Sequence, residues 1–455
     1  MGKRDTALIL LLSLLTIFAI KPHYGGQATI RLNEPTSFSL NTSNYSNLVL
    51  YSLIYENFFY LDVDGTVYSH LFETYAYDAR SRTLSLALKD NLSFSNGKPI
   101  TPGHIRFSLQ NYLNQDLFSA IRLRKVLKNI RVDGNQILLE LLQDNPDTLA
   151  MLTTPDLVLI AENEQIFSGP FTPAEWEKNR YIILKANPFY PGGRTFLDEV
   201  KILFDDTAIP EIFLGAPSQL KNEYQEFNSG IFQNIYLCFP QGGVGQNTRV
   251  ALYTLIKKFN EVSNTGFIEL HSLTSDEESP VSIRIKPVSE QKMISILKFA
   301  DIKFYILSSL VSLEPGIDSY LLRMRAKVET IVIDDSQLKN FLANNSVKYI
   351  LIDKIFQKKT PTEEKIGQIL KELSFSQFND KYLRMLAELN EVRYINNQEL
   401  LIEQIARMNE TLINDGFILP LFQKKYSLYV RNNLQAIKID YYGRPLLHKT
   451  RINRE

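Results

Sequence analysis

Residues 86–101 read LALKDNLSFSNGKPIT, and this stretch holds the clearest local signals in the chain. It continues an alternation of polar and apolar residues over 82–88, which is typical of a half-buried strand. Asn96-Gly97 predicts a tight hairpin turn, because both residues tolerate a positive φ. Thr101, followed by a proline, predicts the beginning of a helix, where a hydroxyl side chain caps the first turn. The sequence therefore predicts a strand, a turn and a helix in succession.

Similar signals recur along the rest of the chain. Strands are expected at 27–33, 136–142, 327–333 and 347–352, two more within 172–204 around a Pro-Gly-Gly loop, and another that begins at 418. Helices are expected at 46–59, 249–260, 335–344 and 398–414, and a loop from 210 to 246. Because strands and helices are mixed throughout, the sequence predicts an α/β or α+β protein with more than one lobe.

Length, charge and residue counts narrow the classes of function. A chain of 455 residues, 44% of them hydrophobic, predicts two to three domains with real cores. The 50 basic and 50 acidic side chains balance, which argues against a nucleic-acid binder. Cys238 is the single cysteine, and no two of the five histidines are three or four residues apart, so no metal site is expected. We find no catalytic constellation and expect no cofactor.

The amino terminus predicts export. Lys3 and Arg4 precede Ala7–Ile20, which is uncharged and mostly apolar, as in a secretory signal. The run is shorter than the roughly 20 residues of an ordinary transmembrane helix. A small-x-small cleavage pattern is lacking near Ile20. Residues 1–22 are therefore expected to be a signal peptide or an uncleaved membrane tether, and the protein to lie in the periplasm or on the outer face of the cytoplasmic membrane.

Several blocks of sequence occur together in one order. They are Tyr55-Glu56, the Asp-Val-Asp-Gly turn at 62–65, the stretch 86–101, Gly169-Pro170-Phe171, NPFYPGG at 187–193, LDEV at 197–200, NTRVAL at 247–252 and INDGFILPLF at 413–422. In order and spacing this set resembles the bacterial extracellular solute-binding proteins, family 5, which include the oligopeptide-, dipeptide- and nickel-binding proteins of ABC importers. The resemblance covers roughly residues 26–445.

The resemblance implies an architecture and a function. The fold would be of the α/β class, two-lobed and periplasmic-binding-protein-like, with a hinge and a ligand cleft between the lobes. Residues 26–45, 165–235 and 421–455 would form the core of lobe one, 46–164 its extra subdomain, and 236–420 lobe two. The protein would be a monomer and not an enzyme, and it would deliver a peptide or other small polar solute to an ABC permease.

The same resemblance implies which residues line the cleft. In the family, ligand contacts come from the loop before the tyrosine-glutamate helix and from strands of lobe two. By position these would be Asn44, Tyr45 and Asn47, and from lobe two Tyr236 and Phe356. The other interpretation of the loop is a helix cap with solvated polar residues, since Ser and Asn are favoured there.

The sequence also departs from the family pattern. Members often carry Gly-Trp followed by Asp-Pro in lobe two, where the tryptophan stacks on ligand and the acid binds its amine. Here residues 353–364 read DKIFQKKTPTEE and match neither. A degenerate member with a structural, sensory or scaffolding role and no transported ligand is therefore an alternative. A hydrolase that uses the same cleft is a third hypothesis, which only the cleft itself would support.

Overall fold

The computed structural model describes most of the chain and divides it into two compact units. The described residues are 24–453 except 36–37, 39–44, 116, 163–165, 206–207, 216–221, 241–243, 264–267, 271, 275–285, 299–300, 308–309, 311–316, 318–321, 323–326, 335–336, 345–346, 358–361, 374–379 and 393–397. The predicted leader, 1–22, and Asn44 lie outside them. Unit 1 runs to Ser229 and resumes at Ser427, and unit 2 is Gly230–Tyr426. The predicted lobe boundaries, and the separate subdomain at 46–164, stay predictions.

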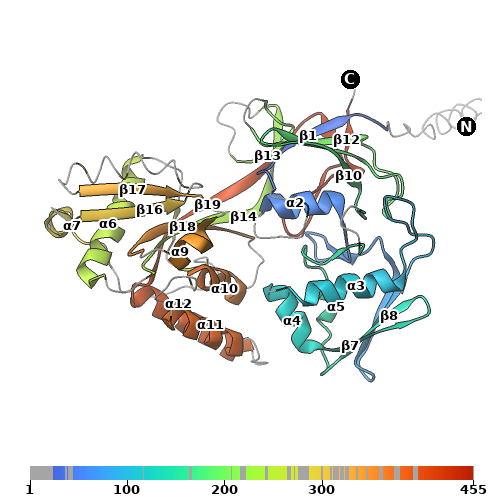
Figure 1. Cartoon of the computed structure of the whole chain (residues 1–455), viewed down its shortest axis with the longest axis horizontal. Helices are drawn as coiled ribbons and strands as arrows, with labels where there is room; N and C mark the ends of the chain where they lie inside the picture. Colours follow the sequence, from blue (N-terminus) through green and yellow to red (C-terminus); the bar gives the residue numbers. More distant parts are fainter. Residues whose placement is uncertain are drawn as a thin grey trace, which may run out of the picture. The chain divides into compact units, whose positions relative to one another are not determined.

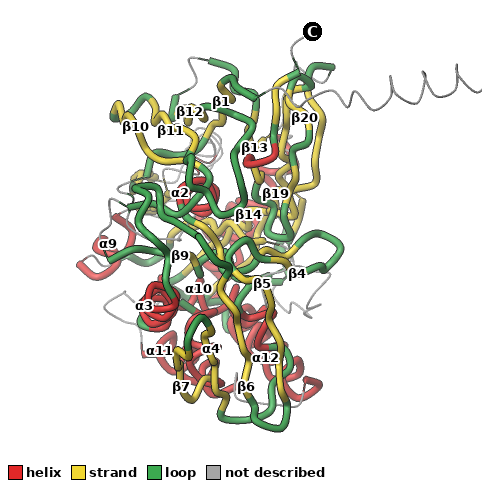
Figure 2. The backbone as a smooth tube through the Cα atoms, turned by 90° about the vertical axis from the view of Figure 1, so that its right-hand side faces the viewer, coloured by secondary structure: helices red, strands yellow, loops and turns green. Residues whose placement is uncertain are grey.

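Unit 1 contains one half of an 11-stranded sheet. Its strands β1 (Gln27–Arg31), β10 (Phe171–Glu177), β11 (Tyr181–Ala186), β12 (Glu199–Leu203) and β13 (Ile212–Gly215) lie together in Figure 2. Strand β1 pairs in parallel with both β12 and β13, while β10 and β11 add antiparallel pairs at one end. Ala28 and Ile30 of β1 are fully buried, which accounts for the alternation expected there.

A smaller antiparallel sheet follows along the chain in unit 1. Its order is β5 (Phe72–Asp78), β6 (Thr83–Leu88), β8 (Gln136–Leu141) and β7 (Leu127–Asp133). Helices α3 (Pro102–Leu113), α4 (Phe118–Val126) and α5 (Thr148–Met151) lie beside it (Figure 1). The strand at 82–88 and the helix start at Thr101 are confirmed. The backbone N–H of Thr101 donates to Nδ1 of His104 at 3.0 Å, in a capping box.

The carboxyl end of the chain returns to unit 1 as short elements. They are β20 (Leu434–Gln435), β21 (Lys438–Ile439), β22 (Pro445–Leu446), the 3₁₀-helix η3 (Leu447–Lys449) and β23 (Arg451–Ile452). They contact helix α2 (Tyr45–Ile54) and the short strands that follow it, β2 (Glu56–Asn57), β3 (Tyr60–Leu61) and β4 (Val67–Tyr68). Residues from opposite ends of the sequence therefore build one core.

Unit 2 continues the large sheet. Its strands are β15 (Ile268–Glu269), β16 (Asp301–Leu307), β17 (Lys327–Ile333) and β18 (Ile350–Gln357), with most of β14 (Tyr224–Cys238) and part of β19 (Ile418–Arg431). Its helices are α6 (Gln246–Ser263), α7 (Glu290–Leu297), α9 (Leu338–Asn344), α10 (Thr362–Leu373), α11 (Asp380–Val392) and α12 (Gln398–Asn414). Strand β16 pairs in parallel with β17 and β18, whereas β14 runs antiparallel to β18. In the described residues no helix is both long and apolar enough to cross a bilayer.

Three sequence expectations were wrong in extent. The helix expected at 46–59 ends at Ile54, because Glu56–Asn57 pairs with β9 (Val158–Leu159) instead. The expected loop at 210–246 contains β13 and the long strand β14. Tertiary burial explains the second error, since β14 is covered on both sides from Phe232 to Cys238 and lacks the alternation of a half-buried strand. The region 172–204 holds three strands rather than two.

Candidate functional site

The predicted ligand contacts in unit 1 lie at the beginning of helix α2. Tyr45 is 6% exposed, and its hydroxyl donates to the carbonyl of Gly443 at 2.8 Å. Burial raises the pKa of Tyr45 well above that of a free tyrosine. Asn47 is buried two residues further along the same helix. Asn44 lies outside the described residues.

The predicted contacts in unit 2 lie on neighbouring strands. Tyr236 of β14 is fully buried, and its hydroxyl donates to the carbonyl of Leu273 at 2.5 Å. Phe356 of β18 is 2% exposed and pairs in register with Phe232, their rings 6.1 Å apart. All four described candidates are thus enclosed by the protein's own side chains and main chain. Their contact with a ligand stays a prediction.

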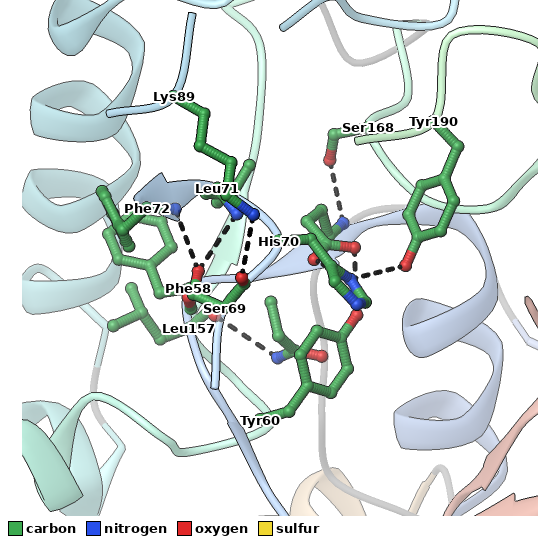
Figure 3. A network of polar contacts seen from close by, with 12 residues as sticks. Phe58, Tyr60, Ser69, His70, Leu71, Phe72, Lys89, Leu157, Ser168 and Tyr190 are labelled. Atoms are coloured by element: carbon green, nitrogen blue, oxygen red, sulfur yellow. Dashed lines mark hydrogen bonds and ion pairs between the residues drawn. The ribbon is translucent and has the colours of Figure 1, made fainter. Parts of the chain in front are cut away.

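A second polar cluster in unit 1 is centred on Glu56, whose side chain is fully buried. We call Glu56, Tyr60, His70, Tyr190 and His448 the Glu56 junction. Tyr60 donates its hydroxyl to Oε2 of Glu56 at 3.0 Å, and Nδ1 of His70 lies 3.0 Å from Oε1. The hydroxyl of Tyr190 reaches the same His70 nitrogen at 3.1 Å (Figure 3).

Two glycines of the family-like blocks leave room for the close packing around this junction. Gly169 donates its N–H to the carbonyl of Ile54 at 3.0 Å, and a Cβ added there would lie 2.5 Å from the Ile54 main chain. The adjacent Ser168 donates to the carbonyl of Leu159 and accepts the Glu56 N–H at 3.0 Å. A Cβ on Gly192 would lie 2.5 Å from the ring of Tyr190.

Burial dominates the electrostatics of the junction. It raises the pKa of Tyr60 and Tyr190 well above the usual value, and the Glu56 charge adds to this. Burial also lowers the pKa of His448 to about 3, helped by the charges of His70, Lys449 and Lys438. The tyrosines are therefore neutral donors and His448 is a neutral ring at ordinary pH.

A buried ion pair joins the junction to the chain end. Nη2 of Arg444 lies 2.7 Å from Oδ2 of Asp440, and Nη1 donates to Oδ1 of Asn57 at 3.2 Å. Burial lowers the pKa of Arg444, but the charge and hydrogen bond of Asp440 more than offset this and hold the pKa above the usual value. These contacts hold elements together and leave no reactive group exposed, so we interpret this pair as structural.

Unit 2 has a row of polar side chains on three adjacent strands, which we call the Gln233 row. Gln233 of β14 donates from Nε2 to Asp353 of β18 at 2.6 Å. It accepts from the hydroxyl of Tyr426 of β19 at 2.7 Å. Burial, with a contribution from the Asp353 charge, raises the pKa of Tyr426 to about 12. Asp353 and Tyr426 are only half-buried, which distinguishes them from the enclosed candidates.

Sequence reasoning missed both clusters. His70 and His448 were considered only as possible metal ligands, and over the described ranges no three His, Cys, Asp or Glu side chains converge as a metal site would require. The usable signal was the set of family-like blocks, since Glu56, Ser168–Gly169 and Tyr190–Gly192 all come from them or from their immediate neighbours.

Comparisons with known proteins agree with those blocks. Residues 66–209 match the sequence model of the bacterial extracellular solute-binding proteins, family 5, middle region. The oligopeptide-binding protein AppA of Bacillus subtilis is 27% identical over 252 residues, which cover 46% of this chain and 46% of that protein. The chain is therefore similar to this family over residues 66–209. The nickel-binding protein NikA of Staphylococcus aureus is 20% identical over 158 residues, 33% of this chain and 32% of that protein. The matched parts thus span less than half of either relative.

Two solved structures extend the likeness to the fold. AppA of Bacillus subtilis in complex with a nonapeptide superposes with a TM-score of 0.74 at 15% identity, over 95% of this chain and 100% of that one. The dipeptide-binding protein of Pseudoalteromonas sp. SM9913 in complex with Met-Leu gives 0.74 at 11% identity, over 94% and 100%. The two-lobed α/β fold implied by the resemblance is therefore confirmed.

Proposed function

We propose that this protein is an extracytoplasmic solute-binding protein that captures a peptide or similar small polar solute by hinge closure and delivers it to an ABC permease. The observation that carries the proposal is the fold match along 95% of the chain to a protein whose structure was solved in complex with a nonapeptide. The sequence relatives are named as an oligopeptide-binding protein, a nickel-binding protein and a probable D,D-dipeptide-binding protein, and these names support the same class of activity. At this identity the likeness supports the class of solute and not one solute.

The path of the chain fits a hinge. Strand β14 leaves unit 1 between Ser229 and Gly230, and β19 returns to it between Tyr426 and Ser427. Gly230 has a φ of +62° inside β14, a conformation that glycine adopts without strain. Hinges are a few residues that absorb a change of backbone torsion. A solute that binds the closed state more tightly would shift the population toward closure.

The Gln233 row offers better-placed solute contacts than the enclosed candidates. The hydroxyls of Tyr45 and Tyr236 already donate to main-chain carbonyls, so a solute would have to displace those bonds. Asp353 and Tyr426 are half-buried and combine a carboxylate with a hydroxyl. A carboxylate with neutral donors nearby suits the amine and amide groups of a peptide. We therefore propose the Gln233 row as part of the solute site, beside the contacts that the resemblance implies.

The alternative, a degenerate member without a solute, is favoured by one observation, the absence of Gly-Trp and Asp-Pro from residues 353–364. Native mass spectrometry of gently purified protein distinguishes the two. Our proposal expects a copurified mass in the peptide range, which raises the melting temperature when added back to emptied protein. Emptied protein that gains no stability and shows no smaller radius of gyration with a broad panel of peptides and metal complexes would favour the degenerate member.

The proposed location outside the cytoplasm has a test of its own. Deleting residues 1–22 should move the protein into the cytosolic fraction, because these residues carry the only signal-like segment that we recognise in the sequence. Finding the intact protein in the cytosolic fraction would contradict export.

A further inference from the structure

Hydrogen bonds and ion pairs hold the carboxyl-terminal segment, residues 438–450, against residues 45–62. The Tyr441 N–H donates to the carbonyl of Leu61 at 2.9 Å. Lys438 pairs with Asp62 at 3.6 Å, and Arg444 binds Asn57 as described above. These are hydrogen bonds and ion pairs between parts of the chain that are distant in sequence. The segment therefore stays in place only while its contacts outweigh the entropy gained on release.

His448 lies inside this attachment. It sits on η3 and is 6% exposed. Its ring meets the ring of His70 edge-on at 5.2 Å and tilts against Tyr190 at 5.9 Å. Nδ1 of His70 is in turn bound to the buried carboxylate of Glu56. A proton added to His448 would thus sit in a buried site beside a second imidazole, whose Nδ1 already faces the Glu56 carboxylate.

The groups around His448 oppose a positive charge there. Positive charges come from His70 when it is protonated, from Lys438 on β21 and from Lys449 on η3 itself. The other titratable groups of the packed elements are Glu56 on β2, Tyr60 on β3, Asp62, Tyr68 on β4, Tyr190, and the Asp440–Arg444 pair. The carboxylate of Glu56 contacts His70 and that of Asp440 contacts Arg444, so each acid is bound to a residue other than His448.

We propose that the carboxyl-terminal segment is a latch that acid releases, with His448 as its proton-sensitive contact. In the latched state His448 is enclosed and neutral, and once released it is a solvated histidine with an ordinary pKa near 6.5. The released state therefore binds more protons than the latched state when the pH falls below about 6.5. Release is favoured as the pH falls, by up to about tenfold per pH unit, and is independent of pH above about 7.

The latch does not depend on the identity of the solute. In the location proposed above, outside the cytoplasm, the protein meets the pH of the surroundings. A protein held outside the membrane would meet the acid that operates it.

Hydrogen exchange of the full chain tests the latch. Exchange is followed at pH 7 and pH 5 in peptides that cover 438–450, with intrinsic rates corrected for pH and with β11 as an internal reference in the same unit. We expect the protection of the segment to fall by roughly twentyfold relative to β11. His448→Phe keeps an aromatic ring but cannot take a proton, so its protection should not change with pH. Equal protection in the wild type at both pH values would overturn the proposal.

A matched control separates His448 from histidine titration in general. His104 lies in unit 1 at the third position of helix α3, where glutamine also completes a capping box. His104→Gln should keep the full pH response of the segment. If His448→Phe folds poorly, the histidine proton resonances of the wild type decide, because His448 must not titrate between pH 7 and pH 5. A normal titration of all described histidines, or a pH response that persists in His448→Phe, would rule out the latch.

Discussion

The Glu56 junction and the Gln233 row are both networks of acid, hydroxyl and amide or imidazole groups, yet they differ in exposure. Glu56 is fully buried and contacts Tyr60 and His70. In the Gln233 row the acid and the tyrosine at the two ends are only half-buried. Closed networks rigidify a fold, whereas partly open ones can exchange a protein or water partner for a ligand. The family-like blocks that supply the Glu56 junction therefore serve folding. The half-buried Gln233 row makes unit 2 the place to look for the solute.

The largest effect is expected from a substitution that disrupts the packing next to the Glu56 junction. Gly169→Ala places a Cβ 2.5 Å from the Ile54 main chain, and neither strand β2 nor helix α2 can move without opening the core. We expect a loss of about 3 kcal/mol in the free energy of unfolding, at the top of the range for overpacking. Urea denaturation measures it. Gly103→Ala is the control, because its Cβ would meet only Thr101 Oγ1 at 3.4 Å in a helix, where alanine is favoured. Equal losses of stability in the two variants would show that small shifts of the structure relieve the close approach at Gly169.

The second prediction compares the two networks directly. Glu56→Gln and Asp353→Asn each remove one charge and keep the shape of the side chain. We expect Glu56→Gln to cost about 2 kcal/mol, since it weakens charge-assisted bonds in a dry site. Asp353→Asn should cost less than about 1 kcal/mol, because water reaches the group. Unfolding of both variants in parallel at pH 7 gives the answer. A larger cost for Asp353→Asn would reverse the assignment of folding and binding roles.

Local signals in the sequence predicted the local structure well. The strand at 82–88, the helix cap at Thr101 and the end of the last helix at Gly416, where φ is +70°, depend on neighbouring residues and agree with the structure. Strand β14 was missed because its burial depends on β18 and β19, which come much later in the chain. The Glu56–His70–His448 contact could not be found from spacing, since its members come from the two ends of unit 1. Only the family resemblance predicted that the two ends of the sequence belong to one lobe.

The third prediction concerns Tyr45, which the resemblance places at the ligand and the structure encloses. Tyr45→Phe removes the hydroxyl that donates to the Gly443 carbonyl and leaves that acceptor buried. We expect a cost of about 1 kcal/mol in stability. If Tyr45 also contacts solute, binding of the copurified solute falls as well, and calorimetric titration of emptied protein shows this. A loss of stability with unchanged affinity would remove Tyr45 from the site.

The smallest expected effect on stability tests the Gln233 row as the solute site. Tyr426→Phe removes one half-buried hydroxyl that donates to Gln233, so the free energy of unfolding should change by less than about 1 kcal/mol. If the row binds solute, affinity for the copurified solute should fall about tenfold, which corresponds to about 1.4 kcal/mol. Tyr429→Phe is the matched control on the same strand, where the ring stacks on Phe213 at 5.5 Å within unit 1. Its affinity should equal that of the wild type. If Tyr426→Phe also binds the solute with the affinity of the wild type, the half-buried Gln233 row serves something other than solute binding.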